Sequence, residues 1–403
     1  MRTAVITGLG VMAPTGRTVA AHWSAVLAGR SALTTISQFD ASGYPVRVAG
    51  TVPGFEPRSH VPGRVVPQTD RWTHLGLAAA AQALDDAALD PATVPEYEMG
   101  VTTASSSGGT EFGQREIEAL WRDGPSHVGA YQSIAWFYAA TTGQISIRHG
   151  LRGPCGVLVT EQAGGLDAIG QARRLIRSGL RAVVTGGTDA SLCPYGVVAQ
   201  LSSGRLSTAT DPSRAYAPFD AYAAGHVPGE GGGMLIVEEA QAAAERGAAH
   251  RYGAVAGYAA TFDPPPGSTR PPALGRAIRG ALADAGLAPD QVGAVFADAA
   301  AVPELDRQEA EAIAEIFGPY GVPVTAPKTM TGRLYAGGAS LDLVTALMAL
   351  REGVVPPTSG VRCPVDELRL DLVRDSPRQV ALEHVLVVGR GYGGFNAAVV
   401  LSR

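Results

Sequence analysis

The chain has 403 residues, of which 46% are hydrophobic and 17% are charged, and its formal net charge is −5. This length is too great for one small core and predicts two domains or one large duplicated α/β unit. The slightly acidic balance, without a basic cluster interleaved with aromatic residues, excludes nucleic acid as an expected partner.

Cysteine usage and hydropathy predict a soluble cytoplasmic protein without a membrane partner. Cys155, Cys193 and Cys363 are sparse, odd in number and without CxxC spacing, which indicates a reducing compartment and neither a disulfide framework nor a metal site. Cys155 precedes a strand and is expected to be a buried core thiol. No apolar run reaches the about 20 residues of a membrane helix, and the run at residues 4–8 ends too early for a signal peptide.

The first half of the sequence alternates predicted strands and helices. Gly8 and Gly10 are expected to turn the first strand. Together with Gly16 they suggest a dinucleotide site, but Pro14 stands where the phosphate-binding helix should begin, so we expect no cofactor. Strands are predicted over 2–7, 99–103, 157–159, 182–186 and 234–238, and helices over 18–27, 71–89, 111–121, 134–147 and 239–246.

The second half repeats this alternation. It predicts parallel sheets covered by helices on both faces, and the break near residues 247–252 divides the chain into two similar halves, 1–250 and 251–403. Strands are predicted over 252–262, 292–297, 322–325, 385–390 and 397–401, and helices over 272–285, 305–317 and 339–350.

The stretch 157–168 is the most informative part of the sequence. A β-branched run leads through Glu161-Gln162-Ala163-Gly164-Gly165 into an amphipathic helix that ends at Ser178-Gly179, which is typical of a buried strand followed by a helix N-terminus. Such a terminus lowers the pKa of a thiol and stabilises an oxyanion, so an acyl-transfer enzyme holds its nucleophile there. Here the turn holds Gln162, which is neither nucleophile nor base.

Several motifs, in family order along nearly the whole chain, resemble those of β-ketoacyl synthases. The resemblance implies a thiolase-like α/β fold in which two similar βαβαβαββ halves form five α-β-α-β-α layers. The motifs are Val5-Ile6-Thr7-Gly8-Leu9-Gly10-Val11, Arg152-Gly153-Pro154, Ala215-Tyr216-Ala217-Pro218-Phe219-Asp220, Gly229-Glu230-Gly231, Pro327-Lys328-Thr329-Met330-Thr331-Gly332 and Gly391-Tyr392-Gly393-Gly394-Phe395-Asn396.

Three departures fall on the catalytic positions of the family. Where working ketosynthases carry a cysteine and two histidines, this sequence has Gln162, Asp298 and Arg333. Condensation needs a thiolate to carry the acyl group, and two hydrogen-bonding groups to decarboxylate malonyl-ACP and hold the enolate. Because glutamine cannot form the thioester, we expect no catalytic residue on this chain.

Residues 161–168 are similar to those of chain length factors, the ketosynthase β subunits of type II polyketide synthases. This resemblance implies an obligate heterodimer with a ketosynthase α subunit, a tunnel for the growing polyketide at the interface, and contact with the acyl carrier protein mainly through the partner. The family's glutamate and lysine match Glu309 and Lys328, which we expect to form a structural ion pair.

The same resemblance places the determinants of chain length on the helix after Gly108-Gly109. Thr110, Gly113 and Ile117 share one face of that helix, and because they are small or medium-sized we expect a roomy tunnel and a long polyketide. Tyr195 is either a further wall residue or ordinary interface packing. The apolar helix predicted over 134–147 is expected in a buried core or a subunit interface.

Two further questions stay open at this point. Gln162 either donates a hydrogen bond that assists decarboxylation of a malonyl thioester or, as we favour, caps the helix and fills the space of the missing thiol. For the whole chain, the alternatives to a chain length factor are an active condensing enzyme with atypical residues and a thiolase-like acyltransferase that acts alone on CoA esters. His226, in a glycine-rich loop, is expected to have a local structural role.

Overall fold

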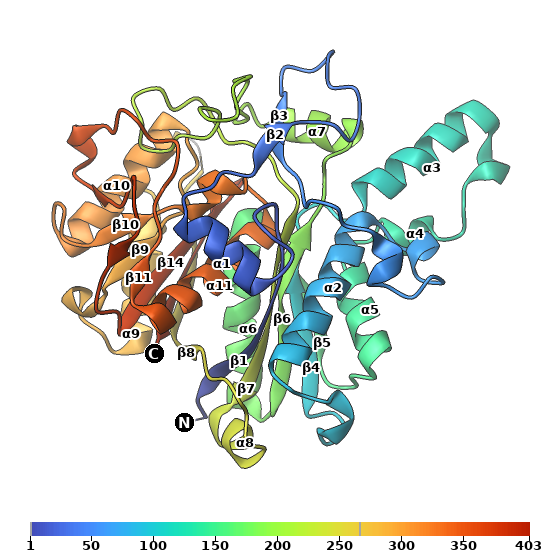
Figure 1. Cartoon of the computed structure of the whole chain (residues 1–403), viewed down its shortest axis with the longest axis horizontal. Helices are drawn as coiled ribbons and strands as arrows, with labels where there is room; N and C mark the ends of the chain where they lie inside the picture. Colours follow the sequence, from blue (N-terminus) through green and yellow to red (C-terminus); the bar gives the residue numbers. More distant parts are fainter. Residues whose placement is uncertain (1, 266) are drawn as a thin grey trace.

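The computed structural model describes residues 2–265 and 267–403, and its framework is an 11-stranded mixed sheet (Figure 1). The strand order is β12-β10-β9-β14-β15-β8-β1-β7-β6-β4-β5. The strands are β1 (Ala4–Met12), β4 (Met99–Ala104), β5 (Cys155–Leu158), β6 (Ala182–Asp189), β7 (Gly231–Glu239), β8 (Gly253–Phe262), β9 (Ala294–Phe296), β10 (Pro323–Thr325), β12 (Asp371–Leu372), β14 (His384–Gly391) and β15 (Phe395–Ser402).

The sheet consists of two halves with the same strand order, which confirms the predicted duplication. The orders are β5-β4-β6-β7-β1 and β10-β9-β14-β15-β8, with β12 added at the second edge. In each half the outer two strands are parallel, and the pairs β6–β7 and β14–β15 are antiparallel. A short antiparallel pairing of β1 with β8, at Val5 and Ala254, joins the halves. The boundary between residues 250 and 251 stays a prediction.

Helices complete the five α-β-α-β-α layers of the expected thiolase-like fold. In the middle layer, α6 (Gly164–Ser178) and α11 (Ala336–Glu352) contact strands of both halves, and α11 is buried from Ala336 to Leu350. The outer layer of the first half contains α2 (Arg71–Asp86) and α5 (Ala140–His149), and that of the second half contains α9 (Leu274–Ala285) and α10 (Pro303–Phe317) (Figure 1).

The expected turn at Gly8 and Gly10 is wrong, because β1 continues through both glycines to Met12. Helix α2 lies directly on them. A Cβ on Gly8 would be 2.1 Å from the carbonyl oxygen of Ala83, and one on Gly10 would be 1.9 Å from that of Ala79. The glycines therefore allow a close contact between helix and strand, which a sequence pattern cannot distinguish from a turn.

The helix predicted over 134–147 is confirmed only in part, because it is not continuous. The chain instead forms α4 (Gln132–Ala135) and α5, separated by Trp136–Ala139, because the carbonyl of Trp136 accepts a hydrogen bond from the Gly109 N–H (3.2 Å). No described helix is long and apolar enough to cross a membrane. The remaining helices and strands are α1 (Val19–Leu27), α3 (Thr110–Asp123), α7 (Pro194–Leu201), α8 (Ala240–Glu245), β2 (Leu33–Thr35), β3 (Val48–Gly50), β11 (Val354–Val355) and β13 (Arg378–Gln379).

Candidate functional site

Gln162 lies in a single turn, Glu161–Ala163, that leads from the end of β5 into α6. Its side chain is completely buried and packs on α11, since a Cβ on Gly338 would be 2.6 Å from its Nε2. Neither amide atom finds a hydrogen-bond partner among the described residues. The expected capping role is wrong, because α6 begins without a side-chain cap.

Glu161 holds the turn in an uncommon conformation, with a φ of +52°. Its Oε2 accepts hydrogen bonds from the backbone N–H groups of Gln162 (2.7 Å) and Tyr392 (2.9 Å), and lies 4.0 Å from Arg333 Nη2. Burial raises the pKa of Glu161, although the Arg333 guanidinium and both N–H groups oppose the shift. The carboxylate thus ties the turn to the last hairpin of the sheet.

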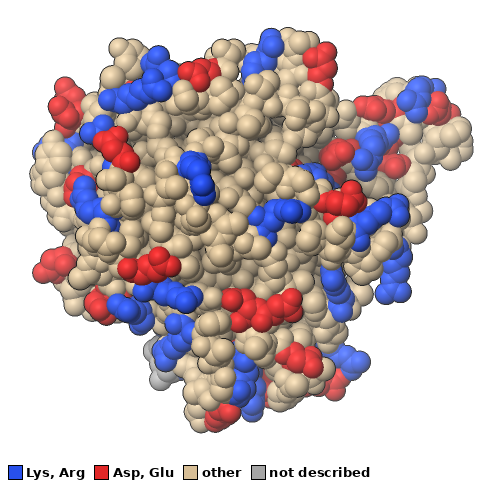
Figure 2. All heavy atoms as spheres, in the orientation of Figure 1, with Lys and Arg blue, Asp and Glu red and all other residues tan. Residues whose placement is uncertain are grey.

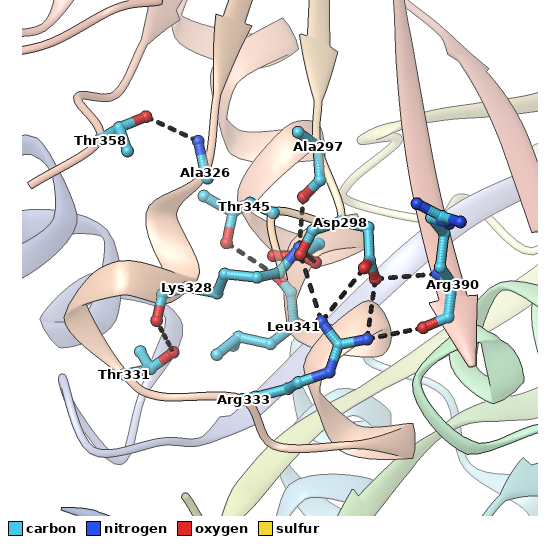
Figure 3. A network of polar contacts seen from close by, with 12 residues as sticks. Ala297, Asp298, Ala326, Lys328, Thr331, Arg333, Leu341, Thr345, Thr358 and Arg390 are labelled. Atoms are coloured by element: carbon cyan, nitrogen blue, oxygen red, sulfur yellow. Dashed lines mark hydrogen bonds and ion pairs between the residues drawn. The ribbon is translucent and has the colours of Figure 1, made fainter. Parts of the chain in front are cut away.

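Asp298 and Arg333 form a buried ion pair at the end of β9 (Figure 3). Arg333 Nη2 also donates to the carbonyl of Arg390 (2.6 Å), and the Arg390 N–H donates to Asp298 Oδ1 (2.8 Å). Burial alone would raise the pKa of Asp298, but the charges of Arg333 and Lys328 outweigh it and hold that pKa below its usual value. Both side chains are therefore charged and paired, so neither can replace a neutral imidazole.

Lys328 and Glu309 both lie beside this pair, but the ion pair expected between them is wrong: no ion pair joins them among the described residues. Lys328 Nζ lies 2.8 Å from Asp342 Oδ2 of α11 and donates to the carbonyl of Ala297 (Figure 3). Glu309 accepts from the backbone N–H groups of Asp298 (2.7 Å) and Ala299 (2.8 Å). Sequence reasoning missed Asp342, whose charge within an apolar helix was the available signal.

A cavity of about 260 Å³ opens next to the ion pair. Its lining comes from both halves, and the buried His226 is part of it; burial, followed by the charge of Arg333, lowers the pKa of His226, so its ring is neutral. The guanidinium of Arg205 lies 4.9 Å from the ring centre of the exposed Tyr392 in the same wall. Other lining residues are Ser106, Thr110, Glu161, Gly196, Asp298, Arg333 and Tyr335.

Of the four expected tunnel residues, Thr110 lines the cavity, whereas the other three are not part of its lining. Gly113 is buried, and Ile117 and Tyr195 are exposed by 41% and 42%. The ring of Trp136 lies beside Gly113 and 6.2 Å from that of Tyr195. Trp136 thus packs between the helices α3 and α7. The prediction of one continuous helix over 134–147 did not indicate this role.

The cysteines do not form a catalytic centre. Cys155 is exposed, contrary to expectation, because β5 is the edge strand of the sheet. Cys193 is buried, and its Sγ accepts from the Gly196 N–H (3.4 Å) at the start of α7, while Cys363 is exposed. Within the described ranges, no cluster of histidine, cysteine and acidic residues is arranged to hold a metal ion.

Comparison with known proteins assigns this architecture to a family. Residues 1–243 match the N-terminal domain of β-ketoacyl synthases and residues 252–362 match the C-terminal domain. The chain belongs to the β-ketoacyl synthase family. Its relatives include the tetracenomycin polyketide synthase ketoacyl synthase beta subunit of Streptomyces glaucescens (59% identity, covering 99% of this chain and 98% of the relative) and the actinorhodin polyketide putative beta-ketoacyl synthase 2 of Streptomyces coelicolor (57%, 99% and 98%).

Solved structures agree with this assignment. The ishigamide ketosynthase/chain length factor has a TM-score of 0.91 at 27% identity, covering 100% of this chain and 99% of the solved chain. A type II polyketide synthase acyl carrier protein in complex with its ketosynthase, bound to the hexaketide, has a TM-score of 0.89 at 26% identity, with the same coverage. Both likenesses extend over the whole β-ketoacyl synthase fold.

Proposed function

We propose that this chain is a chain length factor, the non-catalytic β subunit that pairs with a ketosynthase α subunit in a type II polyketide synthase. The observation that carries the proposal is the state of the three catalytic positions. The amide of Gln162 occupies the position of the nucleophile, and the two imidazole positions hold Asp298 and Arg333, which form an ion pair. A relative that carries the β-subunit name, 59% identical over 99% of this chain, supports the same function.

The exposed surface around β5 supports a partner at this edge. β5 has one unpaired side at the end of the sheet, and its residues are exposed or half-buried. Large apolar side chains remain exposed close to it in sequence, which is unusual for a free surface and typical of obligate interfaces. They are Ile134, Trp136, Phe137, Tyr138, Ile147 and Val159.

The charge distribution supports a protein partner over a nucleic acid. Figure 2 shows acidic and basic residues interspersed on the visible face, without a single basic region. We assign contact with the acyl carrier protein mainly to the ketosynthase α subunit, because that subunit would carry the thiolate. The free cysteines favour the cytoplasm as the location of the complex.

The chain would act by shaping the space that receives the growing polyketide. Thr110 already lines a cavity, and we infer that Gly113, Ile117 and Tyr195, which lie on the adjoining helices α3 and α7, extend this wall toward the partner. A partner that covers this surface would turn the region into an enclosed tunnel. The small side chain of Thr110 in the cavity wall supports a long product.

The test is reconstitution with a ketosynthase α subunit and an acyl carrier protein. We expect the two subunits to copurify as a heterodimer and to produce a full-length polyketide only together. The isolated chain, incubated with malonyl-ACP or a malonyl-CoA ester, should remain unacylated by intact-mass measurement. Covalent acylation of the isolated chain, or condensation by it alone, would support the active-enzyme alternatives and overturn the proposal.

A further inference from the structure

Three glycines near the start of α3 leave space for one segment, Ala135-Trp136. A Cβ on Gly108 would be 2.3 Å from the carbonyl oxygen of Trp136, and one on Gly109 would be 2.1 Å from that of Ala135. The Gly109 N–H donates to the Trp136 carbonyl at 3.2 Å. The backbone at Trp136 is therefore seated directly on the turn before α3, and its position is fixed by that contact.

The third glycine determines where the indole ring lies. A Cβ on Gly113 would be 2.2 Å from Cε3 and 2.5 Å from Cζ3 of Trp136, well inside van der Waals contact, so any side chain at 113 must displace the ring. On another side, the ring faces Tyr195, and the Tyr195 N–H donates to Gln114 Oε1 (2.9 Å), which ties α7 to α3. The indole thus lies beside two helices that are themselves linked.

This position is next to the cavity. Thr110 is about one helical turn before Gly113, Gly196 directly follows Tyr195, and both Thr110 and Gly196 line the cavity wall. Trp136 as a whole is still 37% exposed at the apolar surface. Trp136 consequently contacts a helix whose first residue lines the cavity, and it is itself part of the exposed apolar surface at which the partner is placed.

We propose that Trp136 is a specificity-determining residue for polyketide length and that residues 113 and 136 form a size-matched pair. This inference rests on the proposed function. The absence of a side chain at 113 does not leave an empty space, because the indole fills it. The space available to the polyketide is then set by the indole, and a larger residue at 113 acts by pushing the indole away.

A double-mutant cycle in the heterodimer with a ketosynthase α subunit tests the pair. The variants are Gly113→Ala, Trp136→Ala, Trp136→Phe and the double variant Gly113→Ala/Trp136→Ala, and the readouts are the Tm of the heterodimer and the mass of the polyketide. We expect Gly113→Ala to lower the Tm and to change product length. Trp136→Ala should lengthen the product by at least one two-carbon extension, with Trp136→Phe between it and the unmodified chain.

The coupling is the decisive result: in the Trp136→Ala background, Gly113→Ala should change neither Tm nor product length further. Trp121→Ala is the matched control, because this tryptophan lies on α3 with its side chain 82% exposed, and it should leave both readouts unchanged. Additive effects of the two substitutions would overturn the inference. If Trp136→Ala prevents assembly, the product of the assembled Trp136→Phe variant decides, and an unchanged length counts against the inference.

A separate variant distinguishes failure of the inference about Trp136 from failure of the proposed function. Thr110→Phe alters a residue that lines the cavity directly. If it changes product length while the Trp136 variants do not, only the inference about Trp136 is wrong. If neither Thr110→Phe nor any Trp136 variant changes the product of an assembled heterodimer, the chain does not set polyketide length and the proposed function itself is overturned.

Discussion

Arg333 donates a hydrogen bond to the carboxylate of Asp298 from each terminal nitrogen, with Nη2 3.1 Å from Oδ1 and Nη1 3.2 Å from Oδ2. The side chains of Asp298 and Arg333 are exposed by only 1% and 5%. From the resemblance to working ketosynthases, we infer that both stand at the positions of two histidines. Either replacement alone would leave an unpaired charge in the interior, so the two substitutions compensate each other.

Breaking this pair should be costly. We expect Asp298→Asn to lower the free energy of unfolding by about 3 kcal/mol, because it leaves the buried Arg333 guanidinium with only the more distant carboxylate of Glu161, 4.0 Å away, as a counter-charge. Denaturant titration of the heterodimer measures the loss. The control is Asp371→Asn, which breaks the more exposed pair with Arg378 and should cost at most about 1 kcal/mol.

The joint replacement Asp298→Leu with Arg333→Met should be milder than either single substitution, because no charge remains buried. A joint variant as unstable as the sum of the singles would show that the two residues do not act as a pair.

Asp306 should make stability depend on pH. Burial raises its pKa from 3.8 to about 7; the Phe219 N–H opposes this shift and the charge of Glu309 adds to it. Because the folded chain holds a proton that the unfolded chain has lost, this contribution is complete below pH 3.8 and decreases as the pH rises toward 7. We expect Asp306→Asn to flatten the stability profile between pH 5 and 7 by roughly 1 kcal/mol per pH unit. An unchanged profile would assign the pH dependence to other groups.

Gln162 should matter little for production. Its amide is buried without hydrogen-bond partners among the described residues, so Gln162→Ala removes an unsatisfied polar group along with some packing. We expect the intact heterodimer to make nearly the same amount of polyketide, as measured by product yield under matched protein concentrations. A large loss from a heterodimer that still assembles would favour the alternative in which this amide assists decarboxylation.

Thr110 is the expected tunnel residue with the most direct position, in the cavity wall. Thr110→Phe should shorten the polyketide by at least one two-carbon extension, because the ring would occupy space that the chain would otherwise fill. Product mass spectrometry measures the change, and Thr110→Ser, which adds no volume, is the matched control. Equal product masses from both variants would exclude gating at this residue.

The fold could be predicted from the sequence because its strands are buried runs of apolar residues. The apolar runs of β6, β7, β14 and β15 and the glycines after α5 and α9 locate most of the elements. Individual contacts could not be predicted in the same way. Gly8 and Gly10 make room for a helix that lies about 70 residues later, and Lys328 contacts an acid on α11 instead of Glu309.

The candidate site was predictable in its chemistry but less so in its geometry. The resemblance to ketosynthases predicts the loss of the cysteine and both histidines, whereas the pairing of Asp298 with Arg333 depends on the approach of β9 to the turn before α11. The break at Trp136 depends on a hydrogen bond to Gly109, which apolar periodicity does not encode.

The middle layer limits how the two halves can be treated experimentally. Helix α6 belongs to the first half and α11 to the second, and each packs on strands of both halves. Expressing the halves separately, divided near residue 250, would therefore expose one buried face of each helix. Such fragments would expose large apolar surfaces and aggregate. We therefore expect the duplicated halves to fold only together, as one unit.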